Sequence, residues 1–427
     1  MIILVGIWGW SLAAQVAPQQ GLSLDSLFSL VEKQDPMAEA ASIYASISSA
    51  RQASVCAGLG PVVRLAGQAS WQSDVTSIDL DFPDHLPLNT ADFGFPEMPR
   101  ETFKLQLEIQ QPIYQGGRTR LQAYEASADH QISLASLQQS VSARKAQAMQ
   151  LFFSIQLMKI SEDVSEAFLR ELDARLQVAG ANHSHGTLPR YGKQLLEAEK
   201  ARLNQRLTEI RFAEKAARET LVLLAGDTSL AHRSLIRPEI ASSPTSAWQR
   251  PELAIADLRV YKLQLSESLL QAGKRPGIAA FSQLGYGKPG LNMFEEDFSP
   301  YALAGLKLEW LLWDNYGRKR KQEVIRHQQS LVRQEKARLE EGIQASVLRQ
   351  QAVIDKFTRM LQSDEEIVGL REEISRAAAA QLDEGVITPD VYVQRSNEAY
   401  RARLEMETHR IQLEMARAEL NFIIGKW

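Results

Sequence analysis

Two long stretches of this chain contain almost no residue that breaks a helix. The first extends from Arg118 to Ala179 without proline or glycine, and the second extends from Arg318 to Asp383 without proline. Since an α-helix rises 1.5 Å per residue, a helix of about sixty residues is about 90 Å long, which exceeds what a globular domain needs. Apolar residues recur three and four apart in both stretches, which predicts coiled-coil packing.

The two stretches belong to two similar halves of the sequence. Gly117-Arg118-Thr119-Arg120 recurs as Gly317-Arg318-Lys319-Arg320, and each follows a segment in which apolar and polar residues alternate. A shift of 199 residues also matches the turn at 186–189 with the turn at 385–388. Because the landmarks recur in the same order, they indicate an internal duplication.

Each half is expected to contain a helix, two strands, a long helix, a tight turn and a closing helix. In the first repeat, residues 20–226, we predict a helix near 23–58, strands near 62–73 and 102–114, and helices near 118–179 and 189–225. In the second repeat, residues 249–425, we predict a helix near 251–273, strands near 277–287 and 300–313, and helices near 318–383 and 389–424.

The predicted strands have the pattern of membrane strands. From Phe103 to Ile109, apolar and polar residues alternate without a break, and each strand is about ten residues long. A strand between lipid and water requires this alternation. Aromatic residues near the strand ends favour a membrane interface, although a soluble sandwich would hold them in its core. They are Trp71, Tyr114, Tyr286, Trp310 and Trp313.

One chain supplies only four such strands. Transmembrane barrels have at least about eight, because an open edge in lipid leaves backbone groups without partners. Several copies of the chain must therefore pool their strands, and a three-fold ring would supply twelve. After residue 14 no apolar window of about 18 residues occurs, so helices would not carry the chain through a membrane.

The N-terminus and the overall composition narrow the class of protein. Residues 1–14 form an apolar run that ends in small residues, which fits a signal peptide, although a buried strand has the same composition. The net charge of −4 gives no global basic field for nucleic acid. The single cysteine, Cys56, excludes an internal disulfide and is expected to be a buried small residue.

The ordered set of motifs resembles the TolC-type outer-membrane efflux proteins. It comprises the strand ending in QPIYQGGR, the long helix, the turn GVITPD, and closing helices that end in LLAG and IIG, and it covers residues 20 to 427. The resemblance implies an α+β membrane protein that is a homotrimer, with a twelve-strand β-barrel in the outer membrane. A long α-helical, coiled-coil barrel would continue it across the periplasm.

The same resemblance implies a function and partners. Such a protein is the exit duct of a tripartite efflux pump or a type I secretion system, a passive conduit gated at its periplasmic tip. It would contact outer-membrane lipid, a periplasmic adaptor (membrane fusion) protein and, through the adaptor, an inner-membrane RND or ABC transporter. Neither enzymatic activity nor a cofactor, metal or nucleic acid is expected. The alternative is a periplasmic adaptor or coiled-coil scaffold without a channel.

The resemblance places the gate of the channel at the tight turns, where the adaptor is also expected to bind. In the second turn the candidates are Gly385, Thr388 and Asp390, with Thr388 as N-cap and Pro389 at the first helical position. Asp390 either complements the helix dipole or, repeated by symmetry, forms an acidic ring that favours cations. Family acids often lie one residue later, at the position of Val391.

The matched turn of the first half carries no acid. Its candidate tip residues are Gly186, Pro189 and Arg190.

The double glycine before the first long helix raises two possibilities, a phosphate cradle or a corner. The stretch lacks the spacing GxxxxGK[ST] of a phosphate loop. Its recurrence in the second half instead predicts a joint where a strand turns into a helix, since glycine permits the bend. The predicted joint residues are Gly116, Gly117, Arg118, Gly317 and Arg318. Four basic residues there, Arg118, Arg120, Arg318 and Lys319, are expected to pair with anionic headgroups or neighbouring chains.

Overall fold

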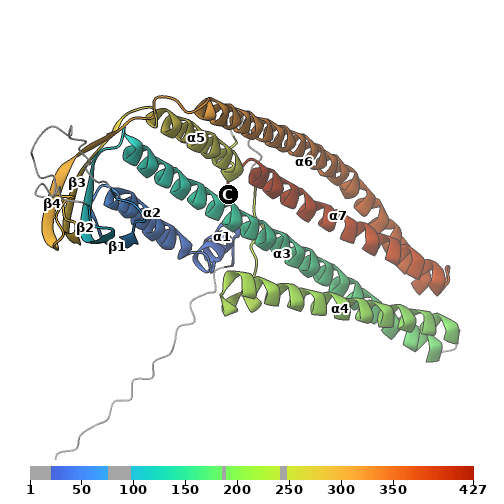
Figure 1. The fold of residues 1–427 in the computed structure, drawn as a ribbon. Helices are drawn as coiled ribbons and strands as arrows, with labels where there is room; N and C mark the ends of the chain where they lie inside the picture. The colour runs from blue at the N-terminus through green and yellow to red at the C-terminus, as the bar shows by residue number, and fades with distance from the viewer. Residues whose placement is uncertain (1–20, 76–97, 185–188, 241–247) are drawn as a thin grey trace, which may run out of the picture. The chain divides into compact units, whose positions relative to one another are not determined.

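The computed structural model describes residues 21–75, 98–184, 189–240 and 248–427. Figure 1 shows its elements. They are α1 (Leu24–Lys33), α2 (Ala40–Ala57), β1 (Val62–Trp71), β2 (Glu101–Tyr114), α3 (Arg118–Ser184), α4 (Arg190–Ala225), the 3₁₀ helix η2 (Thr228–Ala231), α5 (Pro251–Ala272), β3 (Gly277–Lys288), β4 (Ser299–Glu309), α6 (Gly317–Asp383) and α7 (Pro389–Ile423). The predicted signal peptide, residues 1–14, and Gly186 lie outside the described residues.

The chain divides into two compact units. Unit 1 takes the described residues of 1–40, 136–253 and 338–427, and unit 2 takes those of 41–135 and 254–337. The long helices α3 and α6, of 67 residues each, contribute to both units. Each unit therefore combines segments from both halves of the sequence, so that neither unit coincides with a predicted repeat.

The single helix predicted near 23–58 is wrong, because the structure has two helices there. Helix α1 ends at Lys33 and α2 begins at Ala40. Pro36 lies between them and lacks the N–H that an uninterrupted helix would need. The Asp35 carboxylate accepts a hydrogen bond from the backbone N–H of Met37 at 2.8 Å, which stabilises the turn.

The core of unit 1 lies where α1 packs on the long helices. Ser23 caps α1, and its hydroxyl accepts a hydrogen bond from the backbone N–H of Ser26. The apolar face of α1 packs in one cluster with Phe152 and Phe153 of α3, neither of which is accessible to solvent. A second cluster joins α3, α4, α6 and α7 around Phe168 and Tyr392.

Unit 2 contains one antiparallel sheet with the strand order β1-β2-β3-β4, visible in Figure 1. Strand β4 ends at Glu309, so the predicted strand 300–313 is too long. The last pair on β3 is Gly277 with Glu309, and the preceding Pro276 has no N–H with which to continue the ladder. Among the described residues, none of the helices combines the length and apolarity needed to cross a membrane.

Cys56 differs from its prediction as well. It lies in the last turn of α2 and is exposed rather than buried. Most of the residues of α2 are exposed, since few described residues pack on this helix.

Candidate functional site

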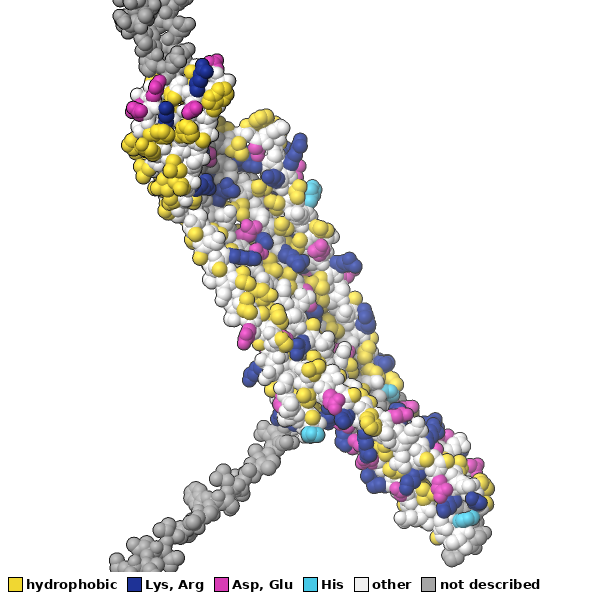
Figure 2. Space-filling view, turned by 60° about the horizontal axis from the view of Figure 1, so that its bottom comes forward, with side chains coloured by type: hydrophobic (Ala, Val, Ile, Leu, Met, Phe, Trp, Pro, Cys, Tyr) yellow, Lys and Arg dark blue, Asp and Glu magenta, His cyan; other side chains and the backbone are white. Residues whose placement is uncertain are grey.

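The sheet of unit 2 has one apolar face and one largely polar face, which also carries Phe281 and Leu303. Directly opposite residues of antiparallel strands lie on the same face, and one such row consists of Leu65, Leu107, Leu284 and Ala302. The apolar face is uncovered, since Leu65 is 71% and Leu306 is 72% exposed. Figure 2 shows the hydrophobic side chains gathered over the strands, whereas charged side chains are scattered over the helices.

The polar face carries a contact that crosses three strands. Tyr301 on β4 donates a hydrogen bond to Gln106 Oε1 on β2 at 2.9 Å. To reach it, the tyrosine lies over Gly285 on β3, where a Cβ atom would collide with the ring. This glycine therefore makes room for an aromatic side chain on the polar face.

Both edges of this sheet are free within the part of the chain that the structure describes. Strand β1 is paired only with β2, and β4 is paired only with β3. A free edge presents a row of backbone N–H and C=O groups that can pair with another chain.

At the first joint, two glycines in the left-handed region connect β2 to α3. Gly116 has φ +68° and Gly117 has φ +85°. A Cβ atom on Gly116 would lie 2.8 Å from the carbonyl oxygen of Ala272 and 2.9 Å from Cβ of Arg275. The Arg275 guanidinium also donates to the Gly116 carbonyl at 3.1 Å. The bend therefore requires glycine at 116 for both conformation and space.

At the second joint, the structure differs from the prediction for Gly317. The left-handed residues are Asn315 (φ +48°) and Tyr316 (φ +60°), which correspond to Gly116 and Gly117 under the shift of 199 residues. Gly317 is the first residue of α6, and a Cβ atom there would meet nothing closer than 3.8 Å. The match of Gly117-Arg118 with Gly317-Arg318 therefore predicted the second bend one residue too far along the chain.

The basic residues of the joints have different surroundings. Arg318 is engaged in its own chain, where Nε donates to Asp314 Oδ2 at 2.7 Å and Nη1 to the Gly273 carbonyl at 3.0 Å. Arg120 donates to the Tyr124 hydroxyl at 3.0 Å. Arg118 and Lys319 are exposed. The predicted pairing of these residues with anionic headgroups or neighbouring chains stays a prediction. It applies least to Arg318, whose guanidinium is already bound within its own chain.

One short segment of unit 2, residues 272–275, holds both joints. It contacts Gly116 through Ala272 and Arg275, and it binds the second joint through two carbonyls. The Gly273 carbonyl accepts from Arg318, and the Lys274 carbonyl accepts from the Trp310 indole N–H at 2.9 Å. The sequence pattern did not indicate this segment. Every residue has a backbone carbonyl, so residue type does not reveal which carbonyls accept hydrogen bonds.

The turn between α6 and α7 is closed by Gly385. Its φ is +73°, and the backbone N–H of Val386 donates to the Gln381 carbonyl at 2.8 Å, as in a Schellman motif. Thr388 occupies the N-cap position of α7, but its side chain makes no capping hydrogen bond. Pro389 is the first helical residue, and Asp390 is exposed in the first turn.

The turn between α3 and α4 is described only in part. Pro189 occupies the N-cap position of α4, and Arg190 is the first helical residue. Both are exposed.

A cluster of polar side chains lies close to these turns in sequence and joins three helices of unit 1. We call it the Tyr392 cluster, and it consists of Glu171, Arg175, Asp383, Tyr392 and Ser396. Tyr392 on α7 is inaccessible to solvent, and its hydroxyl donates to Glu171 Oε1 on α3 at 3.0 Å. The Ser396 hydroxyl donates to the same oxygen at 3.4 Å.

Arg175 connects the cluster to α6. Its Nη1 lies 2.6 Å from Asp383 Oδ2, and its guanidinium carbon lies 5.7 Å from the centre of the Tyr392 ring. The cluster therefore links α7 to α3, and α3 to α6. None of its five residues was singled out from the sequence. The only feature of the sequence that indicated the cluster was a tyrosine, Tyr392, on the apolar stripe of α7.

Tyr392 provides a test of this geometry by pH. Burial, together with the nearby Glu171 charge, raises the pKa of Tyr392 from its ordinary value of 10.0 to about 12. The native state thus favours the neutral phenol, and this stabilisation is complete below pH 10 and is lost as the pH rises from 10 to about 12. Over that window we expect the unfolding free energy to fall by about 3 kcal/mol more in the natural protein than in Tyr392→Phe.

The absorbance of tyrosinate measures this directly. The difference between the titrations of the natural protein and Tyr392→Phe is expected to have its midpoint near pH 12. A midpoint near pH 10 would show that the phenol is solvated and the cluster is not formed.

The comparisons with known proteins concern the fold. No protein-family model matches the chain, and no curated protein matches it by sequence. The outer-membrane channel OprN superposes with a TM-score of 0.70 at 15% identity, over 94% of this chain and 89% of that chain. CusC, whose structures concern transmembrane channel formation, superposes with a TM-score of 0.71 at 12% identity, over 98% of each chain.

The outer membrane protein VceC from Vibrio cholerae superposes with a TM-score of 0.67 at 13% identity, over 94% of this chain and 96% of that chain. The chain has the fold of the TolC-type outer-membrane channels. The likeness extends over nearly the whole of each chain, so it includes the four strands and both helical hairpins. The expected fold class, long helices with a four-stranded antiparallel sheet, is confirmed.

Proposed function

We propose that this protein is an outer-membrane channel, the exit duct of a tripartite efflux pump or a type I secretion system. The sheet carries this proposal. It has one exposed apolar face, one polar face and two free edges, in a chain with the fold of outer-membrane channels. An apolar face suits lipid and a polar face suits a water-filled lumen. The adaptor or scaffold alternative has no such support, because the compared structures are channels.

The free edges support a trimer. In a closed ring, β1 of one copy pairs with β4 of the next, so that no backbone group is left unpaired in lipid. Three copies of the four strands give the twelve-strand barrel expected from the resemblance. In this proposal the strands lie in the outer membrane and the long helices extend into the periplasm as an α-helical barrel.

The helices supply the remaining parts of the proposal. The exposed turns around Arg190 and Asp390 would meet a periplasmic adaptor, which connects to an inner-membrane RND or ABC transporter. The exposed carboxylate of Asp390 is available for an acidic ring at the gate. The two predicted repeats, 20–226 and 249–425, would then supply one sheet hairpin and one helical hairpin each. The protein would catalyse no reaction.

Cross-linking tests the closed ring. In a Cys56→Ser background, Gln68→Cys on β1 combined with Lys307→Cys or Leu303→Cys on β4 is expected to give covalent dimers and trimers on oxidation. The matched control combines Gln68→Cys with Gln283→Cys on β3, which is an inner strand and should give no cross-link between chains. The protein is also expected to need detergent for extraction. A monomer that is soluble without detergent, or no cross-link at any edge pair, would contradict the proposal.

A further inference from the structure

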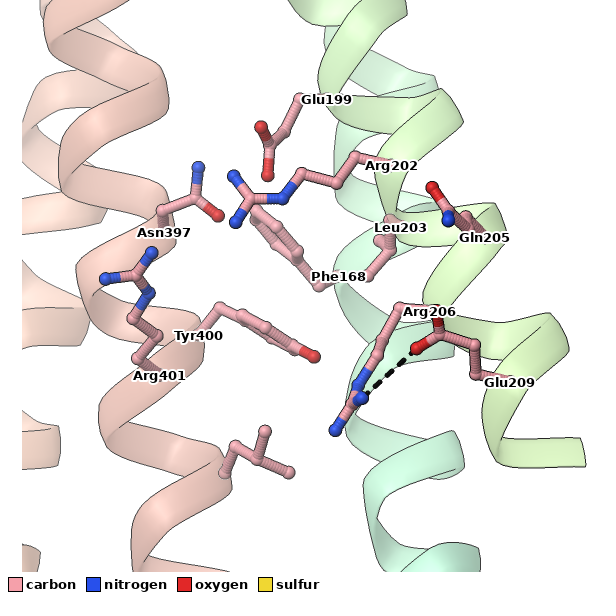
Figure 3. A pocket seen from close by; sticks show the side chains of 11 residues that line it. Phe168, Glu199, Arg202, Leu203, Gln205, Arg206, Glu209, Asn397, Tyr400 and Arg401 are labelled. Carbon is pink, nitrogen blue, oxygen red and sulfur yellow. Dashed lines mark hydrogen bonds and ion pairs between the residues drawn. The ribbon is translucent and has the colours of Figure 1, made fainter. Parts of the chain in front are cut away.

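Unit 1 contains a groove between α4 and α7 that neither the gate nor the sheet uses. Its volume is about 320 Å³, and Phe168 of α3 contributes to its lining. Figure 3 shows Arg202 and Arg206 on α4 and Tyr400 on α7 pointing between the two helices, whereas Arg401 runs along α7 toward Asn397. This volume lies at the lower end of the range of small-molecule sites.

The apolar part of the groove is held in place. The Phe168 and Tyr400 rings are stacked, with centres 4.8 Å apart and planes 16° apart. The Tyr400 hydroxyl is 2.9 Å from the Ser165 hydroxyl, and Ser165 is inaccessible to solvent. Leu203, which is buried, adds an aliphatic surface. The groove therefore offers a fixed aromatic wall to a ligand.

The charged part of the groove contains two arginines that have no partner among the described residues. Most arginines of α4 and α7 form ion pairs: Arg206, Arg211 and Arg218 on α4, and Arg395, Arg403, Arg410 and Arg417 on α7. Arg202 and Arg401 form no hydrogen bond or ion pair with any described residue, yet both line this groove.

The surrounding polar groups leave these two guanidinium groups available. Figure 3 shows the Arg202 guanidinium between the Glu199 carboxylate and the Asn397 amide, and the Arg401 guanidinium on the other side of Asn397. Glu199 also lines the groove but forms no ion pair with either arginine, and Glu209 is occupied by Arg206 at 3.3 Å. With three arginines and two glutamates, the lining carries one net positive charge.

We propose that this groove binds an amphipathic organic anion, an aromatic carboxylate or sulfonate. The acid group would accept hydrogen bonds from Arg202 and Arg401, whose planar donors suit such oxygens. The apolar body would lie against Phe168 and Tyr400. The inference does not depend on the proposed channel function, since none of the residues that it uses belongs to the sheet or to the turns of the proposed gate.

Calorimetric titration of the purified full-length protein with naphthalene-2-sulfonate tests the site. We expect saturable binding that weakens at least tenfold in Arg202→Gln/Arg401→Gln, a loss of about 1.4 kcal/mol or more. Naphthalene-2-methanol, which lacks the charge, is expected to bind at least tenfold more weakly. Arg359→Gln is the matched control, because Arg359 is an exposed arginine of α6 that does not line the groove and forms no ion pair with a described residue.

Two further measurements keep the test decisive. Arg202→Lys/Arg401→Lys keeps the charges, so it is expected to bind more tightly than the glutamine variant. The comparison of the sulfonate with the neutral alcohol uses the natural protein, so it stands even if the glutamine variant misfolds. The affinity of the natural protein is expected to fall as salt rises, because the ligand is held by charge. Equal binding of the sulfonate and the neutral alcohol, or an affinity of Arg202→Gln/Arg401→Gln within twofold of that of the natural protein, would overturn the proposal.

Discussion

Gly116→Ala is expected to destabilise the protein by about 2–4 kcal/mol. Two costs add together, because alanine disfavours the left-handed conformation at φ +68° and its Cβ would approach the Ala272 carbonyl at 2.8 Å. Since that carbonyl is backbone, the joint must shift to relieve the contact. Denaturant unfolding of the purified protein measures the loss.

Two other glycines provide matched controls. Gly317→Ala is expected to change stability by no more than about 0.5 kcal/mol, because Gly317 begins a helix and has free space. Gly385→Ala should cost about 1 kcal/mol, since its φ is +73° but no atom lies within 4 Å of the added Cβ. Equal effects at 116 and 317 would contradict the assignment of the bends.

Tyr392→Ala is expected to cost about 3–5 kcal/mol, because it removes a buried aromatic ring and leaves a cavity among α3, α6 and α7. Tyr392→Phe keeps the ring and loses only the hydrogen bond to Glu171, so it should cost about 1–2 kcal/mol. Thermal unfolding of both variants separates the packing of the ring from the hydrogen bond.

Under the proposed function, the same variants should alter conductance. The Tyr392 cluster holds α7 against α3, so its loss favours conformations in which the tip opens. Each 1.4 kcal/mol changes an equilibrium tenfold, and we therefore expect the open fraction of Tyr392→Ala in planar bilayers to rise at least tenfold. Tyr392→Phe is the matched control and should have a smaller effect. Unchanged conductance in a folded Tyr392→Ala channel would remove the cluster from the gating mechanism.

The local pattern of the sequence was sufficient for most of the elements and for the faces of strand β2. Alternation from Phe103 to Ile109 assigned each side chain to a face, because the side-chain period of a strand is two. The absence of proline after residue 117 indicated the long helix that the structure has over Arg118–Ser184. Pro36 indicates a break in the helix, and a prediction that ignores it gives one helix in place of α1 and α2.

Only the tertiary structure decided which segments far apart in the chain are in contact. Residue type indicated a bend near Gly117 and Gly317, but the backbone places the second bend at Asn315 and Tyr316. The Tyr392 cluster joins residues more than 200 positions apart, as do Phe168 and Tyr400 in the groove. Periodicity depends on neighbours along one helix, whereas these contacts depend on how separate helices are packed. The sequence therefore determined the elements and their apolar faces, and the packing of the helices decided which polar side chains meet.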